Sequence, residues 1–190
     1  MGLDMYLERC NRKAWDYKDL DIENVKATNP KLYEEIKQFV TVRGKYYPWE
    51  SLFEEVGYWR KANAIHHWFV ENVQNGVDDC GRYEVSKEQI QELLDICKRV
   101  VAETQLENGW VQNGSRFENG MMCPIFEEGE TVVNPDVAEA LLPTQDGFFF
   151  GSTDYDQWYI EDIKSTIDIL TQALEETDFE KQTITYSSSW

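Results

Sequence analysis

Hydrophobic and polar residues alternate at the start of the chain and follow helical periods further on. Leu3, Met5 and Leu7 alternate with Asp4, Tyr6 and Glu8, which predicts a strand with one buried face. Residues 181–190 are rich in β-branched and aromatic side chains, which favours a second strand. Because an unpaired strand edge is unfavourable, we expect these two terminal strands to pair with each other.

Five segments have the apolar spacing of amphipathic helices. They span approximately residues 29–40, 56–74, 86–102, 134–142 and 153–176. The third begins with a capping box formed by Ser86 and Gln89. These patterns predict an α+β fold in which four to five helices pack on a small antiparallel sheet that includes the N- and C-terminal strands.

Residues 103–133 lack the helical pattern of their neighbours. The segment contains three Asn-Gly pairs, at 108–109, 113–114 and 119–120. This dipeptide favours tight turns and hairpins. We therefore expect a single domain over residues 1–190, with an irregular or β-rich excursion at 103–133.

The formal net charge of −18 is unevenly distributed along the chain. Residues 1–100 hold 15 Lys and Arg against 18 Asp and Glu, whereas residues 101–190 hold 3 against 18. A negative field repels nucleic acid and anionic membranes and attracts basic partners. We expect no direct binding of nucleic acid or membrane. The acidic half is either a solvated surface or a surface that contacts a basic protein.

Several sequence features bear on compartment and cofactors. No run of about 18 apolar residues is present, and the first residues include acids in place of the apolar run of a signal peptide. The four cysteines form no CxxC pair, which favours a reducing, cytoplasmic location. No nucleotide-binding motif or metal-ligand cluster occurs, so we expect no metal and no cofactor. Association into a homo-oligomer stays open.

Candidate ligand-binding residues gather in the second predicted helix. Trp59 and His66 lie on its apolar arc. Arg60, Asn63 and His67 lie on the neighbouring polar arc. Arg60 is suited to a phosphate or carboxylate, Asn63 to an amide or base edge, and Trp59 to stacking on a ring. The alternatives are an ordinary helix surface and, for His66, a hydrogen-bonded core histidine.

A catalytic alternative uses His67 and Glu71, which are spaced as a general base oriented by a carboxylate four residues on. Adjacent His66 and His67 lie about 100° apart on a helix, so they are poorly placed to share a metal ion. An enzyme built on His67 and Glu71 would carry out hydrolysis or group transfer. We favour a non-enzymatic protein over this alternative.

A second group of candidates lies in residues 141–159. A short apolar strand is predicted at 148–150, followed by a helix that begins at residue 153. The aromatic side chains are too many to bury in one small layer, so we expect some of them to form an exposed aromatic patch or a pocket wall. We include Phe149, Tyr155 and Trp158 in the candidate site.

Four segments of the chain have long and unusual sequences, namely MGLDMYL, YWRKANAIHHWFVENVQNG with the following DDC, LLPTQDGFFFGSTDYDQWY, and the terminal YSSSW. They resemble segments of a family of small uncharacterised proteins encoded by phages and prophages. The resemblance covers about a third of the chain and leaves out residues 103–133. It implies a phage setting in a bacterial host cell and no particular reaction.

The resemblance and the candidate residues together favour a host-interaction or counter-defence protein. We predict that it binds or sequesters a nucleotide-like small molecule without turning it over. The site is expected between the 56–74 helix and residues 148–159. Two alternatives are an acidic nucleic-acid mimic that inhibits a basic host protein, and a small hydrolase or transferase that uses His67 and Glu71.

Overall fold

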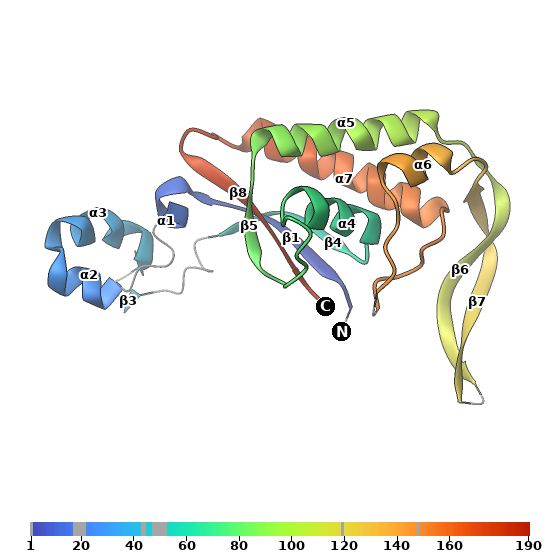
Figure 1. Cartoon of the computed structure of the whole chain (residues 1–190), viewed down its shortest axis with the longest axis horizontal. Coiled ribbons are helices and arrows are strands. Elements are labelled where there is room, and N and C mark those ends of the chain that lie inside the picture. Colours follow the sequence, from blue (N-terminus) through green and yellow to red (C-terminus); the bar gives the residue numbers. More distant parts are fainter. Residues whose placement is uncertain (1, 17–21, 43–44, 47–52, 119, 148) are drawn as a thin grey trace.

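The protein is built around an antiparallel sheet with helices packed on it, as the computed structural model shows (Figure 1). The structure describes residues 2–16, 22–42, 45–46, 53–118, 120–147 and 149–190. The main sheet has the strand order β4 (Glu54–Arg60), β1 (Asp4–Asn11), β8 (Gln182–Ser189) and β5 (Arg82–Val85). All neighbouring strands are antiparallel. The predicted α+β class is confirmed.

The two terminal strands form the centre of this sheet. β1 and β8 pair along their whole length, which confirms the predicted pairing of the chain ends. β4 and β5 occupy the edges, so each terminal strand has a neighbour on both sides. Leu3, Met5 and Leu7 are fully buried, as the alternation in β1 predicts.

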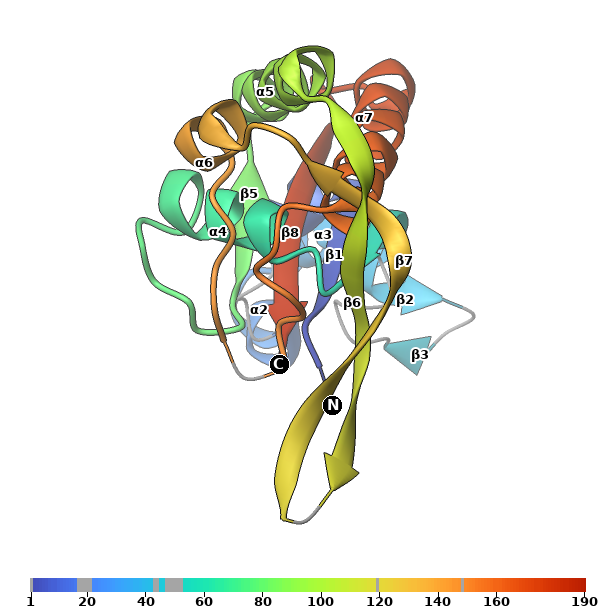
Figure 2. The ribbon, with the colours of Figure 1, turned by 90° about the vertical axis from the view of Figure 1, so that its right-hand side faces the viewer.

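Four helices pack on the side of the sheet that carries these apolar residues (Figures 1 and 2). They are α4 (Asn63–Asn72), α5 (Lys87–Glu103), α6 (Asp136–Leu141) and α7 (Gln157–Glu176). α5 begins with the predicted capping box, in which Ser86 Oγ accepts a hydrogen bond from the backbone N–H of Gln89. α5 and α6 both lie where the sequence predicts helices.

Close contacts hold these helices on the sheet. A Cβ atom at Gly57 of β4 would lie 2.3 Å from the Ile169 side chain of α7, so glycine permits the approach of helix to strand. The ring of Phe69 in α4 stacks on the ring of Tyr186 in β8, with centroids 3.9 Å apart. α4 and α7 are thus fixed against neighbouring parts of the sheet.

Short elements gather at one end of the molecule (Figure 1). They are α1 (Arg12–Asp16), α2 (Ile22–Thr28), α3 (Pro30–Val40), β2 (Thr41–Val42) and β3 (Lys45–Tyr46). α3 begins at the proline that the sequence marks as a helix start. The sequence does not predict α1, α2, β2 or β3. The two helices have at most two turns and the two strands have two residues each, so all four are too short for a periodic signal.

The predicted helix at residues 56–74 is wrong in its first part. Residues up to Arg60 belong to strand β4, and α4 begins only at Asn63. Lys61, with a φ of 63°, breaks the chain direction between the strand and the helix. Trp59 is buried in the alternating pattern of a strand, which over so few residues also fits a helical arc.

Two predictions before α7 are also corrected. The helix begins at Gln157 and not at residue 153, because Asp156 is the residue that caps it. Asp156 Oδ1 accepts hydrogen bonds from the backbone N–H groups of Trp158 and Tyr159, at 2.9 and 3.1 Å. The strand predicted at 148–150 is absent from its described residues, and residue 148 lies outside them.

A long hairpin projects from the body of the protein in the segment expected to be irregular or β-rich (Figures 1 and 2). Its strands are β6 (Leu106–Glu118) and β7 (Met121–Val132). Of the three Asn-Gly pairs, the second lies at a register shift, and Gly120 of the last lies between the two strands at the hairpin tip. The first lies within paired β6, with Gly109 opposite Gly129, so it makes no turn.

Candidate ligand-binding site

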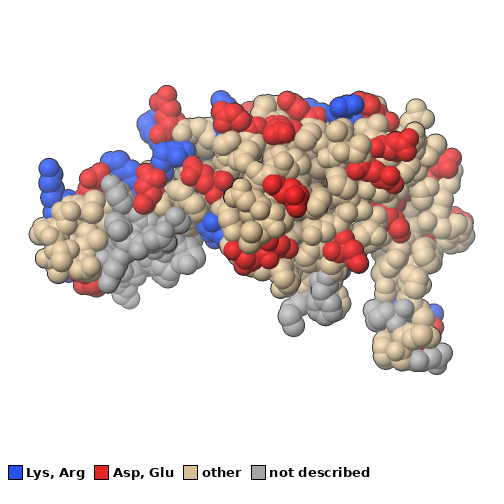
Figure 3. Space-filling model, viewed as in Figure 1, with Lys and Arg blue, Asp and Glu red and all other residues tan. Residues whose placement is uncertain are grey.

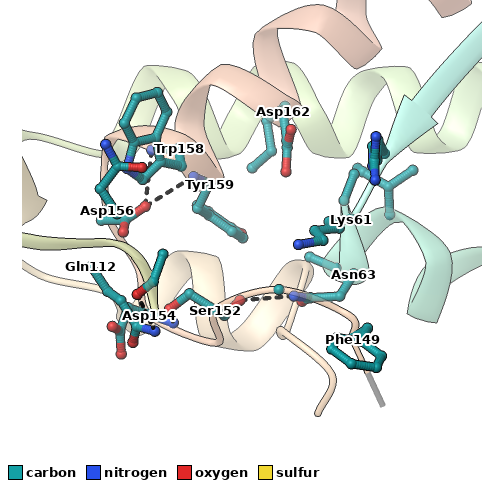
Figure 4. Close-up of a pocket in the computed structure, with 18 of the residues that line it drawn as sticks. Lys61, Asn63, Gln112, Phe149, Ser152, Asp154, Asp156, Trp158, Tyr159 and Asp162 are labelled. Carbon is teal, nitrogen blue, oxygen red and sulfur yellow. Dashed lines mark hydrogen bonds between the residues drawn. The ribbon is translucent and has the colours of Figure 1, made fainter. Parts of the chain in front are cut away.

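A pocket of about 540 Å³ opens where β4, α4, α7 and the hairpin meet (Figure 4). One wall is the end of β4 and the start of α4, and another is the first two turns of α7. Residues 112–115 of β6 and the loop that precedes α7 complete the lining. The pocket lies between the two segments from which the sequence-based candidates come.

Two adjacent cations line this pocket. Arg60 ends β4, and Lys61 follows it in the turn to α4. The Lys61 backbone is fixed, because its N–H donates to the carbonyl of Leu3 at 2.8 Å and its carbonyl accepts from Asn63 at 2.8 Å. Both side chains are exposed, and neither forms a hydrogen bond or ion pair with the described residues. They are available to an anionic group.

Three carboxylates lie in the same pocket. Burial, together with the charges of Glu161 and Asp156, raises the pKa of Asp162 to about 7. Burial also raises the pKa of Asp156, although its hydrogen bonds from the start of α7 oppose that change. Asp154 precedes them in the loop. The pocket is therefore mixed in charge, and one of its acids titrates near neutral pH.

Aromatic side chains stand beside these charged groups. Trp158, in the first turn of α7, is 40% exposed, and Phe149 is 52% exposed with a φ of 61°. Figure 4 shows them on different sides of the pocket. Tyr159 is buried and donates its hydroxyl to the carbonyl of Leu142 at 2.9 Å. Trp158 and Phe149 thus present ring surface that a planar ligand can use.

Polar groups of the hairpin form a further part of the lining. Gln112 Nε2 lies 3.3 Å from the carbonyl of Gly114 and 3.2 Å from Ser115 Oγ. Asn113 Nδ2 donates to Glu127 Oε1 at 2.8 Å. The register shift between Gln112 and Ser115 brings these residues to the pocket.

Asn63 lines the pocket, but its amide is used inside the protein. Its Nδ2 donates to the carbonyls of Phe150 and Ser152, at 3.2 and 2.8 Å. Its Oδ1 accepts from the backbone N–H of Gln145 at 3.1 Å. Asn63 is only 4% exposed. It clamps the loop before α7, and this corrects the expectation that its amide reads a ligand edge.

His66 is a hydrogen-bonded core histidine, the structural alternative that the sequence offered for it. Its Nδ1 lies 2.7 Å from the hydroxyl of Tyr186, and its Nε2 lies 3.0 Å from Asp78 Oδ2. Trp190 Nε1 donates to the other Asp78 oxygen at 3.0 Å. Burial lowers the pKa of His66, and the Asp78 carboxylate opposes that change. His66 is fully buried and does not line the pocket.

The other candidates also lie away from the pocket lining. Trp59 is buried and donates to Thr166 Oγ1 at 2.9 Å. The hydroxyl of Tyr155 accepts from the backbone N–H of Thr144 at 3.2 Å. His67 and Glu71 form no hydrogen bond with each other, and neither lines the pocket.

The pocket therefore contains four of the eight predicted site residues, namely Arg60, Asn63, Phe149 and Trp158. The sequence-based candidates do not include Lys61, Asp162 or Gln112. One sequence signal points to Lys61, which follows Arg60 directly. Another points to Asp162, which lies one helical turn after Trp158.

Comparison with known proteins gives no match to a family model, a curated protein or a solved structure. Within the described ranges, no helix is both long and apolar enough to span a membrane. The same residues contain no group of three or more His, Cys, Asp or Glu side chains placed to hold a metal ion. The functional argument therefore depends on the pocket itself.

Proposed function

We propose that the protein binds a nucleotide-like small molecule in this pocket and holds it without turning it over. One observation carries the proposal. Two cationic side chains that form no hydrogen bond or ion pair with the described residues, those of Arg60 and Lys61, share a pocket with the exposed ring of Trp158. A nucleotide combines the two matching features, an anionic phosphate and a planar ring.

The chemistry of each part supports this class of ligand. Arg60 offers a planar fork of N–H donors and Lys61 a point charge, and both groups bind phosphate oxygens. Trp158 and Phe149 offer faces for ring stacking, which contributes roughly 1–3 kcal/mol per base in single-strand-binding proteins. The volume of about 540 Å³ is within the usual range of small-molecule sites.

The resemblance to phage and prophage proteins suggests a use for such a pocket. A protein that holds a nucleotide-like molecule removes it from solution, and a host pathway that depends on that molecule is then deprived of it. We therefore propose a host-interaction or counter-defence role in the cytoplasm of a bacterial host cell. Sequestration requires affinity alone, which fits a site whose candidate catalytic pair lies outside the pocket lining.

Isothermal titration calorimetry with GMP, AMP, CMP and UMP tests this proposal. Replacing both Arg60 and Lys61 by alanine should weaken binding of any mononucleotide that binds by at least 10-fold, because the phosphate loses its cations. The matched control is the double alanine variant of Lys98 and Arg99, two consecutive exposed cations on α5. If the two double variants bind equally well, or if none of the four nucleotides binds wild-type protein, the proposal is wrong.

A nucleic-acid mimic is the second candidate, and the excess of acids in residues 101–190 favours it. A mimic would bind a basic host protein through long-range charge, so its affinity should fall steeply between low and physiological salt. In Figure 3 the acidic side chains are scattered among uncharged residues on the visible face and form no continuous row. We place the pocket first because the cations Arg60 and Lys61 share it with the exposed ring of Trp158.

A further inference from the structure

Trp158 and Asp162 both project from α7 and both line the pocket. They are four residues apart, so they lie one above the other on the same side of the helix. Figure 4 shows the Asp162 carboxylate directed into the pocket from α7 and the Lys61 side chain directed into it from the β4–α4 turn. A ring that stacks on Trp158 can therefore bring its edge to Asp162 while an anionic substituent points to the cations.

The Asp162 carboxylate has no hydrogen-bond donor within the described part of the chain, although its own backbone carbonyl accepts from Thr166. The charges that act on this carboxylate are those of Glu161 in α7 and Asp156 in the preceding loop. The other titratable or charged groups in the pocket lining are Tyr159, Asp154, Arg60 and Lys61. A partly buried carboxylate without a donor is costly, and the excess of acids beside it adds to that cost. A ligand that supplies N–H groups would relieve both.

We propose that Asp162 accepts two adjacent N–H donors from the ring edge of the ligand, so that the pocket selects guanine among the common bases. The proposal rests on the function inferred above, and it names the part of the nucleotide that gives specificity. Guanine carries a ring N–H beside an exocyclic amino group, and these two donors match the two oxygens of one carboxylate. On the corresponding edges of adenine, cytosine and uracil, each donor is flanked by an acceptor, which an ionised Asp162 repels.

The charges of the pocket favour a single phosphate. Arg60 and Lys61 supply two positive charges, whereas Asp154, Asp156 and Asp162 supply up to three negative ones. A triphosphate carries more negative charge than a monophosphate, and the carboxylates of the pocket would repel that additional charge. A guanine mononucleotide therefore fits the donor and charge pattern better than GTP.

The decisive comparison is between GMP and IMP, which differ only in the exocyclic amino group. In calorimetric titrations at pH 8, GMP should bind at least 10-fold more tightly than IMP or AMP. Asp162→Asn should remove most of that preference, because an amide presents one acceptor and one donor in place of two acceptors. Asp168→Asn is the matched control, since Asp168 is exposed on the same helix and outside the pocket, and it should leave the preference unchanged.

The pH dependence provides a second readout. Because burial raises the pKa of Asp162 to about 7, the carboxylate is mainly ionised at pH 8 and mainly protonated at pH 6. The ratio of GMP affinity to AMP affinity should therefore fall from pH 8 to pH 6 in wild-type protein and stay constant in Asp162→Asn. Using the ratio removes the titration of the phosphate, which both nucleotides share.

The outcomes separate the two proposals. Equal binding of GMP, IMP and AMP overturns the role of Asp162 and leaves nucleotide binding intact. Retention of the GMP preference in Asp162→Asn also overturns it. If no mononucleotide binds wild-type protein, the proposed function and the inference that rests on it fail together. AMP binding by Asp162→Asn reports that the variant is folded, so a lost preference cannot be attributed to unfolding.

Discussion

The pocket and the buried cluster around His66 take residues from the same part of the chain, but they differ in whether their polar side chains have hydrogen-bond partners. Both ring nitrogens of His66 have partners, in Tyr186 and Asp78, and Trp190 donates to the second Asp78 oxygen. Five residues earlier, the side chain of Lys61 has no hydrogen bond or ion pair to the described chain. Polar groups with internal partners hold the fold together, whereas groups that face a pocket without partners are available to a ligand.

Substitution of Asn63 has the largest expected effect on the free energy of unfolding. Asn63 lines the pocket, but its polar groups have internal partners, as those of the buried cluster do. Asn63→Ala should lower the free energy of unfolding by roughly 3 kcal/mol, since one buried carbonyl, one part-buried carbonyl and one N–H lose their partner. Urea denaturation measures it. Asn113→Ala, at an exposed position of the same pocket, should cost less than about 0.5 kcal/mol. Equal costs would remove the distinction between the two groups.

Trp158 should show the opposite behaviour. Trp158→Ala should weaken binding of a mononucleotide by about 10-fold or more, because a stacked ring is lost. The free energy of unfolding should change little, since the side chain is 40% exposed. Trp110→Ala is the control, because Trp110 is 66% exposed on the hairpin and outside the pocket. Loss of affinity in both variants, or in neither, would count against the site.

The ionised carboxylate of Asp162 should lower the free energy of unfolding of the ligand-free protein. Its pKa in the folded protein, about 7, is above its ordinary value of 3.8, so the ionised form costs stability above pH 7 and the cost disappears as pH falls toward 3.8. Asp162→Asn should therefore raise the free energy of unfolding by about 1–2 kcal/mol at pH 8 and by almost nothing at pH 4. A variant less stable than wild type at pH 8 would show that the carboxylate has a partner.

His66 should give a smaller effect with the opposite sign. Burial lowers its pKa below the ordinary 6.5, so the unfolded chain takes up the proton more readily as pH falls below that value. Stability should fall by about 1 kcal/mol or less between pH 7 and pH 5.5. Denaturation of Asp162→Asn protein measures this without the opposing contribution of Asp162. The same slope in a His66→Gln, Asp162→Asn double variant would assign the effect to another group.

Much of the fold could be predicted because the relevant signals are local. The alternation in β1, the proline at the start of α3 and the capping box of α5 each lie within a few residues of sequence. The boundary between β4 and α4 could not be predicted in this way. It depends on the backbone of Lys61 and on the approach of Ile169 to Gly57, which are set by residues far away in the chain.

The site was harder to predict because sequence shows residue types and not their partners. Arg60 and Asn63 look equally polar in the sequence, yet only Asn63 uses its polar groups within the protein. Asp162 resembles an ordinary surface acid until its burial is known, and this burial depends on the packing of α7 against the rest of the pocket. Gln112 reaches the pocket through a register shift in β6, for which a nearby Asn-Gly pair was the only hint.

Native mass spectrometry tests the central claim most directly, namely that the side chains of Arg60 and Lys61, which have no partners among the described residues, hold a ligand. Wild-type protein, the Arg60 and Lys61 double alanine variant and the Lys98 and Arg99 double alanine variant are purified in parallel from the same bacterial host. We predict an added mass of one nucleotide-like molecule on wild-type protein and on the control, and its loss from the Arg60 and Lys61 variant. Bare wild-type protein that also fails to take up added GMP would contradict the account.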